Sequence, residues 1–416
     1  MDTYTISSPS RLHTTVTLPA SKSISNRALV IYALSGCRQL PDNLSDCDDT
    51  DVIMRALQTM PEVIDIKAAG TAMRFMTALL ASVPDYSLAG PHLLTGTERM
   101  KQRPIKVLVD ALRCLGADIC YAGEEGFPPL RIAGRQLEGG HLEVAGNVSS
   151  QFISALLLIG PVLKQGLTLH LTGEIISRSY IDLTLCTMRD YGAAAEWTGV
   201  DTIEVKAGGY KTRPYVIEND WSAASYWYEM VALSPDADAE VHLKGLMDGS
   251  RQGDSGVRYI FSLLGVKTEF ADGVTLRKRG QRVSHIEYDF TNVPDLAQTV
   301  VVTCCALGVH FHFTGLQTLK IKETDRIEAL KRELLKLGFV LRDIGGRELV
   351  WDGALAPNPT HSPIDTYYDH RMALAFAPLS LLTPVSINNP QVVSKSYPHF
   401  WRDLRDAGFS VVKIEN

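Results

Sequence analysis

The chain has 416 residues, of which 45% are hydrophobic and 21% are charged, and its 41 basic and 47 acidic residues give a formal net charge of −6. This composition is typical of a globular protein of two to four domains. An acidic chain lacks the basic surface that nucleic acids require, so we expect no nucleic-acid partner. The longest nearly apolar stretches, 153–163 and 376–387, are shorter than the ~18 residues that cross a bilayer. With no signal peptide visible at the N-terminus, the sequence predicts a cytoplasmic protein without a membrane partner.

The seven cysteines contain no C-x-x-C pair, which favours reduced thiols over disulfides or a metal site. Cys304 and Cys305 stand in the apolar stretch VVVTCCALG. We therefore expect both to be small buried side chains of a helix rather than nucleophiles.

The first predicted helix follows the segment LPASKS and ends at Gly36. Ser21 and Ser23 are candidate N-caps, and Lys22 stands at the start of the helix. Ser23 and Arg27 are four residues apart and share a helical face. Free N–H groups, hydroxyls and two cations at the positive end of a helix dipole indicate an anion site.

Two later segments repeat this arrangement. Gly70 and Thr71 open a helix over residues 70–81, with Arg74 one turn further on, and Ser149 begins another apolar helix in NVSSQFISALLLIG. One such helix start is more often a plain cap, but three in one chain favour anion binding.

More cations stand near predicted helix starts further along the chain. Arg103 precedes a proline, and His370 stands beside an arginine in YYDHRMALAFA. In KETDRIEALKRELLKLG, Lys322 and Arg326 are four apart, which predicts that they share one helical face with Glu323 between them. Taken singly, each of these charges is better explained as a solvated helix end or an ordinary surface ion pair.

An amphipathic helix, a glycine and a β-rich run recur along the chain at intervals of 56 to 76 residues. A glycine there suits a left-handed helix C-cap from which the chain turns into a strand. The glycines are Gly116, Gly192, Gly265, Gly338 and Gly408, and a weaker copy has Met60 at this position. The pattern predicts six small α/β units that share cores, three to a lobe.

Nine motifs occur in one order along the chain: LPASKSISNR, AGTAMR, RMKQRPI, SSQ, SRSYIDLT, PDLAQ, KETDR, DHRMALAFA and SKSYP. Their order and intervals closely resemble those of the 3-phosphoshikimate 1-carboxyvinyltransferases, or EPSP synthases, from about residue 10 to 412. The resemblance implies an α/β fold of two inside-out barrels, each made of three βαβαββ-type repeats. One lobe would combine 1–20 with 219–416, the other would be 21–218, and the active site would lie in the cleft between them.

The implied reaction transfers the enolpyruvyl group of phosphoenolpyruvate to the 5-hydroxyl of shikimate 3-phosphate and releases phosphate, by addition and then elimination. Several cations must balance two phosphates and two carboxylates, so no metal or other cofactor is expected. The family also implies a monomer.

By resemblance, each substrate has its own set of residues. The set for shikimate 3-phosphate is Ser23, Arg27, Ser149, Ser150, Gln151, Ser177, Tyr180, Asp295 and Lys322. The set for phosphoenolpyruvate is Lys22, Gly70, Thr71, Arg103, Gln151, Arg326, Arg371 and Lys395.

The resemblance also implies the acid and base. Asp295 would take the proton of the attacking hydroxyl, and Glu323 would deliver a proton to the methylene carbon with help from Lys22. Neighbouring cations lower the pKa of a carboxyl group, so the proton could instead be shared among Glu323, Lys22 and His370.

The chain departs from the family pattern at three positions. Ala68 stands where an asparagine is common, Phe75 replaces a proline, and Thr318 replaces an asparagine that contacts shikimate 3-phosphate. These changes bear on affinity, because the charged residues of the motifs are present.

Two other functions are weighed against this one. The related enolpyruvyl transferase that uses UDP-N-acetylglucosamine has Lys-Asn where this chain has Lys22 and Ser23, and it commonly uses a loop cysteine, whereas Cys114 is predicted within a helix. A non-catalytic anion-binding homologue would be expected to lack an acid or base, whereas Asp295 and Glu323 are both present.

Overall fold

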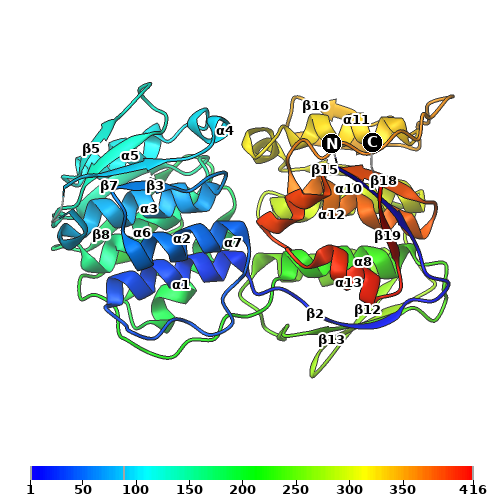
Figure 1. Cartoon of the computed structure of the whole chain (residues 1–416), viewed down its shortest axis with the longest axis horizontal. Coiled ribbons are helices and arrows are strands. Elements are labelled where there is room, and N and C mark those ends of the chain that lie inside the picture. The colour runs from blue at the N-terminus through cyan, green and yellow to red at the C-terminus, as the bar shows by residue number, and fades with distance from the viewer. Residues whose placement is uncertain (1, 88–89, 415–416) are drawn as a thin grey trace. The chain divides into compact units, whose positions relative to one another are not determined.

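The computed structural model describes residues 2–87 and 90–414. Helices and strands are interspersed throughout the described residues, which confirms the predicted α/β class (Figure 1). The chain forms two compact units. Unit 1 is Met1–Pro19 with Glu218–Asn416, and unit 2 is Ala20–Ile217, so the boundaries lie one residue from the expected ones.

A repeat of two parallel strands, two helices and a hairpin builds most of both units. In its clearest copy the second strand pairs with the fourth, which pairs with the third, giving the order β14-β15-β17-β16. The elements of this copy are β14 (His285–Asp289), α10 (Ala297–Leu307), β15 (His310–Thr314), α11 (Arg326–Lys336), β16 (Arg342–Ile344) and β17 (Glu348–Trp351).

Three further sheets have this strand order. The first copy in unit 2 is β3 (Val63–Asp65), α3 (Gly70–Ser82), β4 (His92–Thr95), α5 (Lys106–Cys114), β5 (Asp118–Tyr121) and β6 (Leu130–Ala133). The second is β7 (Gly140–Ala145), α6 (Ser150–Ile159), β8 (Leu167–Thr172), α7 (Arg178–Asp190), β9 (Ala195–Trp197) and β10 (Thr202–Val205). The copy in unit 1 is β2 (His13–Thr17), α8 (Trp221–Leu233), β11 (Glu240–Lys244), α9 (Val257–Leu263), β12 (Val266–Ala271) and β13 (Gly273–Lys278).

The two remaining repeats are incomplete. In unit 1 the N-terminal strand β1 lies between β18 and β19. The first strand of this repeat is reduced to a parallel bridge between Ile364 and Ile387. In unit 2 two helices are accompanied only by a parallel bridge between Asp42 and Val216. The described residues therefore form five sheets for six repeats. The elements are β1 (Thr3–Ser7), α12 (His370–Phe376), β18 (Val385–Asn388), α13 (Phe400–Asp406) and β19 (Ser410–Ile414) in unit 1, and α1 (Lys22–Ser35) and α2 (Asp48–Thr59) in unit 2.

The predicted glycine punctuation is confirmed at all six positions. The five glycines after α5, α7, α9, α11 and α13 have φ between 79° and 97°, and Met60 after α2 has a φ of 39°. A residue with a Cβ is strained in this region, whereas glycine is not. Each helix therefore stops at a left-handed residue, and a strand begins within a few residues of it.

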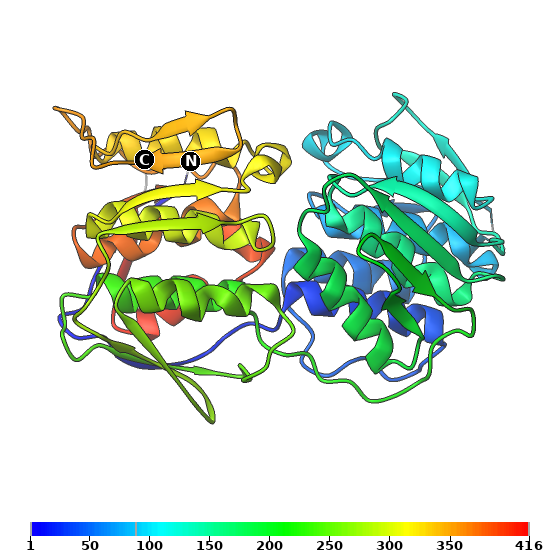
Figure 2. The ribbon, with the colours of Figure 1, turned by 180° about the vertical axis from the view of Figure 1, so that it is seen from behind.

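Three helices at the centre of each unit are largely buried. In unit 2 the helices α1, α3 and α6 pack against one another, and every residue of α3 is buried. In unit 1 α10 packs against α8 and α12, and α8 also contacts β11 and β13, as the view in Figure 2 shows. Cys304 and Cys305 are buried in α10, as expected. The predicted anion-binding motifs stand at the N-terminal ends of these central helices.

Candidate active site

The sequence-predicted site residues are divided between the two units, and we call the two sets the unit 2 cluster and the unit 1 cluster. The unit 2 cluster consists of Lys22, Ser23, Arg27, Gly70, Thr71, Arg103, Ser149, Ser150, Gln151, Ser177 and Tyr180. The unit 1 cluster consists of Asp295, Lys322, Glu323, Arg326, His370, Arg371 and Lys395.

The starts of α3 and α6 meet in the unit 2 cluster. Ser149 caps α6 and accepts a hydrogen bond from the backbone N–H of Gln151 at 3.4 Å, while the Gln151 amide donates to the Thr71 hydroxyl at 3.1 Å. The Arg103 guanidinium lies so close to Gly70 that a Cβ there would be 2.6 Å from Nη1. The absence of a side chain at Gly70 thus lets a cation approach the start of α3.

Lys22 is the first residue of α1, and its ammonium lies 3.6 Å from the carboxylate of Asp49 on α2. The Asp49 side chain is buried, so this pairing holds the cation at the helix start. Ser21 caps the helix by accepting from the N–H of Ile24 at 3.5 Å, as predicted.

Arg27 lies one turn further along α1 and is 4% exposed. Its guanidinium donates to the carbonyls of Ser23 and Tyr180 at 2.8 and 3.1 Å. None of its hydrogen bonds within the described part of the chain goes to a carboxylate. Burial lowers the pKa of Arg27 from its ordinary value to about 10, which reflects the cost of a buried cation without a counter-charge. This arrangement favours an anionic ligand.

Ser177 and Tyr180 stand at the start of α7. Ser177 precedes the helix in the left-handed region, with φ 55° and ψ 38°, and its carbonyl accepts from the N–H of Tyr180 at 3.1 Å. A residue other than glycine keeps such a strained backbone conformation only when its surroundings hold it there, and residues of this kind are frequent at binding sites.

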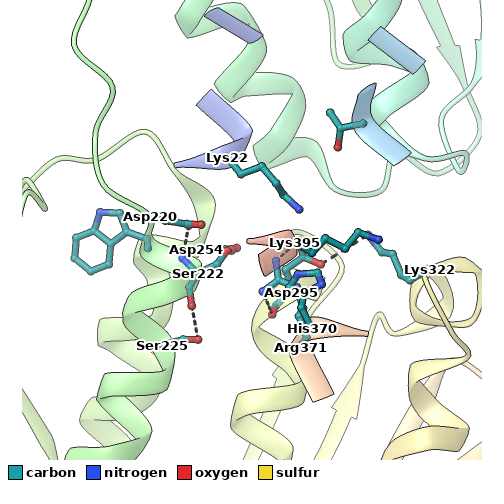
Figure 3. Close-up of polar contacts among 12 residues, drawn as sticks. Lys22, Asp220, Ser222, Ser225, Asp254, Asp295, Lys322, His370, Arg371 and Lys395 are labelled. Carbon is teal, nitrogen blue, oxygen red and sulfur yellow. Dashed lines mark hydrogen bonds and ion pairs between the residues drawn. The ribbon is translucent and has the colours of Figure 1, made fainter. Parts of the chain in front are cut away.

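Asp295 is the centre of the unit 1 cluster. Its carboxylate lies 2.8 Å from Arg371, 3.2 Å from Arg326 and 3.7 Å from Lys322. Figure 3 shows Asp295 beside Arg371 on the neighbouring start of α12. Burial is the main cause that lowers the pKa of Lys322 below its ordinary value. The expected base therefore lies among three cations.

Glu323 is also surrounded by cations. Its carboxylate is 2.9 Å from Lys395 and 3.1 Å from Arg326. Arg326 in turn donates to the fully buried Asp369 at 2.7 Å. Burial alone would lower the pKa of Arg326, but Asp369, Glu323 and Asp295 together raise it. His370 follows Asp369 as the first residue of α12 and is buried.

The expected helical face shared by Lys322 and Arg326 is wrong. The helix α11 begins only at Arg326, because Asp325 caps it by accepting from the N–H of Glu328 at 3.1 Å. Lys322 follows the short 3-10 helix Gln317–Ile321 instead. Both cations nevertheless reach Asp295, so their meeting depends on the fold and not on helical spacing.

Sequence reasoning missed four aspartates of the two clusters. Asp49 pairs with Lys22, Asp369 pairs with Arg326, Asp220 caps α8, and Asp254 accepts a hydrogen bond from the Ser222 hydroxyl. Figure 3 shows Asp220 and Asp254 at the start of α8. The Asp-x-Ser pattern before the apolar run WSAASYWYEMVAL was the available signal for this further helix start.

The three departures from the family pattern have different surroundings. Phe75 is buried, and its ring centroid lies 5.6 Å from the Arg27 guanidinium carbon, which is a cation–π distance. The Thr318 hydroxyl is buried and has no hydrogen-bond partner among the residues that the structure describes. Ala68 is exposed.

Neither a candidate metal cluster nor a candidate membrane-spanning helix occurs among residues 2–87 and 90–414. No group of three or more His, Cys, Asp or Glu side chains within 2–87 and 90–414 could hold a metal ion. Across the same ranges, every helix falls short of the length and apolar character that a bilayer crossing requires.

The fold and the clusters together define an α/β protein of two repeat-built units, each of which places cations and hydroxyls at the starts of its central helices. The chain belongs to the EPSP synthase (3-phosphoshikimate 1-carboxyvinyltransferase) family, which it matches over residues 6–64 and 58–404.

Individual relatives agree with this assignment. A 3-phosphoshikimate 1-carboxyvinyltransferase of Bacteroides fragilis is 58% identical over 410 residues, which are 98% of each chain. One of Photobacterium profundum is 33% identical over 98% of this chain and 99% of the relative. A solved EPSP synthase of Acinetobacter baumannii has a TM-score of 0.78 with this chain, and the match covers 100% of each chain. The two sequences are 20% identical, so this likeness bears on the fold alone.

Proposed function

We propose that this protein transfers the enolpyruvyl group of phosphoenolpyruvate to the 5-hydroxyl of shikimate 3-phosphate, giving 5-enolpyruvylshikimate 3-phosphate and phosphate. Membership of the family supports the reaction. The observation that carries it at the level of residues is the unit 1 cluster, where the carboxylates Asp295 and Glu323 lie among four cations.

Each substrate would have its own set of residues. Phosphoenolpyruvate carries a phosphate and a carboxylate, which suit the arginine forks and ammonium groups of Lys22, Arg103, Arg326, Arg371 and Lys395. Gly70, Thr71 and Gln151 would line the same substrate. Shikimate 3-phosphate would be held by hydroxyls, amide groups and cations, namely Ser23, Arg27, Ser149, Ser150, Gln151, Ser177, Tyr180, Asp295 and Lys322.

In the addition step, Asp295 accepts the proton of the 5-hydroxyl as its oxygen bonds to the central carbon of phosphoenolpyruvate. The methylene carbon becomes a methyl group by taking a proton from Glu323, with Lys22 and His370 able to share that proton. In the elimination step the methyl group returns a proton to Glu323, the bond from carbon to the phosphate oxygen breaks, and the departing phosphate takes up the proton held by Asp295. The surrounding cations stabilise the departing phosphate.

The ion pairs of Asp295 make its basicity depend on the substrates. Three cations in contact lower the proton affinity of a carboxylate. Incoming phosphate and carboxylate groups compete for Arg371, Arg326 and Lys322, so binding releases Asp295 to act as a base. This order of events would keep the base inactive until both anions are bound.

We also propose that the protein acts as a monomer in the cytoplasm and needs no metal, other cofactor or nucleic acid. The seven cysteines support a reducing compartment, because all of them are free.

The test is phosphate release from shikimate 3-phosphate and phosphoenolpyruvate in the presence of a chelator, with each substrate omitted in turn. We expect release only with both substrates, and a loss of about 10²–10⁴-fold in kcat for D295A and E323Q. D352A is the control, because Asp352 is an exposed aspartate that pairs with Arg342 at 3.3 Å, outside both clusters. Release with UDP-N-acetylglucosamine as acceptor would favour the related transferase. Binding of both substrates without release would favour a non-catalytic homologue.

A further inference from the structure

Two buried hydroxyls hold the Arg27 guanidinium. Thr184 on α7 accepts from Nε at 2.7 Å, and Ser154 on α6 accepts from Nη2 at 3.2 Å. Both side chains are fully buried, and their hydroxyls lie 2.8 Å apart. Three helices thus meet at this cation, and none of the three contributes a carboxylate to it.

The hydrogens of this network can be assigned by counting. The Thr184 hydroxyl donates its one hydrogen to the Tyr180 carbonyl at 2.8 Å. It must then accept from both Arg27 and Ser154, which uses both of its lone pairs. The Ser154 hydroxyl therefore donates to Thr184 and accepts from Arg27. Every hydrogen of the two hydroxyls has one place, so the network has a single arrangement.

The same count leaves one donor of Arg27 for a ligand. A guanidinium has five N–H groups. One points to Thr184, one to Ser154, one to Tyr180 and one to Ser23. The fifth, on Nη1, has no acceptor among the described residues, and the cation has no counter-charge there. An anion that accepts a hydrogen bond from this N–H group and neutralises the charge would stabilise a buried cation of this kind.

We propose that Thr184 and Ser154 are positioning residues that orient Arg27 toward the anionic groups of shikimate 3-phosphate. The inference rests on the proposed function and extends it to two residues that do not touch the substrate. Thr184 also holds the Tyr180 carbonyl, so one hydroxyl links three of the proposed contacts to this substrate, namely Ser23, Arg27 and Tyr180.

Thr187 provides a matched control on the same helix. Its buried hydroxyl donates to the carbonyl four residues back, that of Leu183, at 2.8 Å, as the Thr184 hydroxyl does to that of Tyr180. It makes no contact with Arg27. T184V and T187V therefore remove the same kind of helical bond with the same change of shape, and only T184V disturbs the guanidinium.

The experiment compares wild type, T184V, T184S, S154A and T187V by steady-state kinetics and by calorimetric binding of shikimate 3-phosphate alone. For T184V we expect Kd and KM for shikimate 3-phosphate to rise about 5- to 50-fold, because hydrogen bonds to a charged group are lost. We expect kcat to change less than about threefold and KM for phosphoenolpyruvate to stay unchanged. T184S should restore wild-type values, S154A should show a smaller rise, and T187V should match wild type in Kd.

A second arm tests whether the effect passes through Arg27. In an R27K background, which lacks the fork that Thr184 and Ser154 hold, T184V should change Kd less than about twofold. The inference would be overturned by equal Kd values for T184V and T187V, or by a rise in Kd for T184V that is as large in R27K as in wild type. Turnover by the wild-type protein would still support the proposed function. If wild type does not turn over, the function fails and the binding data still decide the inference. A wild type that binds no shikimate 3-phosphate contradicts both.

Discussion

Asp254 shows how a single residue couples the unit 1 cluster to pH. Its carboxyl is buried and accepts a hydrogen bond from the Ser222 hydroxyl. Burial, together with the negative charge of Asp295, raises the pKa of Asp254 from 3.8 to about 7, against the opposing charge of Arg371. The folded protein therefore keeps this proton at a pH where an unfolded aspartate has lost it.

The sign of the pH effect follows from that difference. Stability contributed by the protonated Asp254 is complete below about pH 4 and is lost as the pH rises to about 7. We expect D254N, which cannot ionise, to gain stability relative to wild type between pH 4.5 and pH 8, by roughly 1 to 4 kcal/mol. Urea unfolding at both pH values measures this gain. An unchanged difference between variant and wild type would show that Asp254 does not titrate in this range.

Glu229 gives a second case in the core of unit 1. Its side chain is fully buried in α8, and burial raises its pKa well above the ordinary value of 4.5. Because the pKa in the folded state is the higher one, wild type should lose stability as the pH rises above about 4.5. We expect E229Q to lose less stability than wild type over this range, measured for each protein as the change in Tm between pH 5 and pH 8.5. Parallel changes in Tm for both proteins would contradict this.

At the scale of elements, the helix starts carry both stability and chemistry. Asp369 caps α12 by accepting from the N–H of Arg371 at 2.9 Å and also pairs with Arg326. Asp325 caps α11 in the same way, but its side chain is half-buried and forms no ion pair with Arg326. The two aspartates thus separate the role of a cap from that of a buried counter-charge.

We expect D369A to lower the free energy of unfolding by about 3–5 kcal/mol, because it removes a cap and leaves Arg326 with less compensation. D325A should cost about 1 kcal/mol, the usual effect of losing a cap. Chemical denaturation of the two variants measures both. Equal costs would mean that the ion pair of Asp369 and Arg326 contributes nothing beyond the cap.

A separate prediction concerns the glycines that follow α5, α7, α9, α11 and α13. Gly116 has a φ of 97°, and a Cβ built there would meet no atom within 4 Å. G116A should therefore cost about 1 kcal/mol through backbone strain alone, and G116N should cost less because asparagine tolerates this region. Thermal unfolding of the two variants checks the order. A neutral G116A would show that the backbone relaxes at this turn.

At the scale of the whole molecule, the two units differ in how the chain builds them. Unit 2 is one continuous segment, Ala20–Ile217, whereas unit 1 needs the N-terminal segment to complete two of its sheets. In unit 1 the strand β1 pairs with β18 on one side and β19 on the other, and β2 pairs with β11. Damage to the N-terminus should therefore affect unit 1 first.

I6D tests this dependence, because Ile6 is fully buried in β1. A buried unpaired carboxylate should destabilise unit 1 by more than about 4 kcal/mol. We expect limited proteolysis of I6D to degrade unit 1 and to leave a fragment close to Ala20–Ile217. Loss of both units together would show that unit 2 depends on unit 1 for its stability.

Much of this protein was determined by local sequence. Ser21 and Gly36 mark the ends of α1 because capping and left-handed turns involve only residues within one helical turn. The recurring glycines predicted the repeat for the same reason. The charged residues of both clusters were named from the sequence through the motifs of the family, and some of them also stand at helix starts, as Lys22 of α1 and Arg326 of α11 do.

Only the tertiary structure decided which of these residues meet. Asp295 pairs with three cations from two segments, KETDR and the start of α12, and Arg27 is held by hydroxyls from two other helices. The expected helical pairing of Lys322 and Arg326 failed because a cap at Asp325 delays the helix, yet both reach Asp295 through the fold. Spacing along the chain specifies neighbours within one turn, whereas contacts between segments depend on how the central helices pack, which no local pattern encodes.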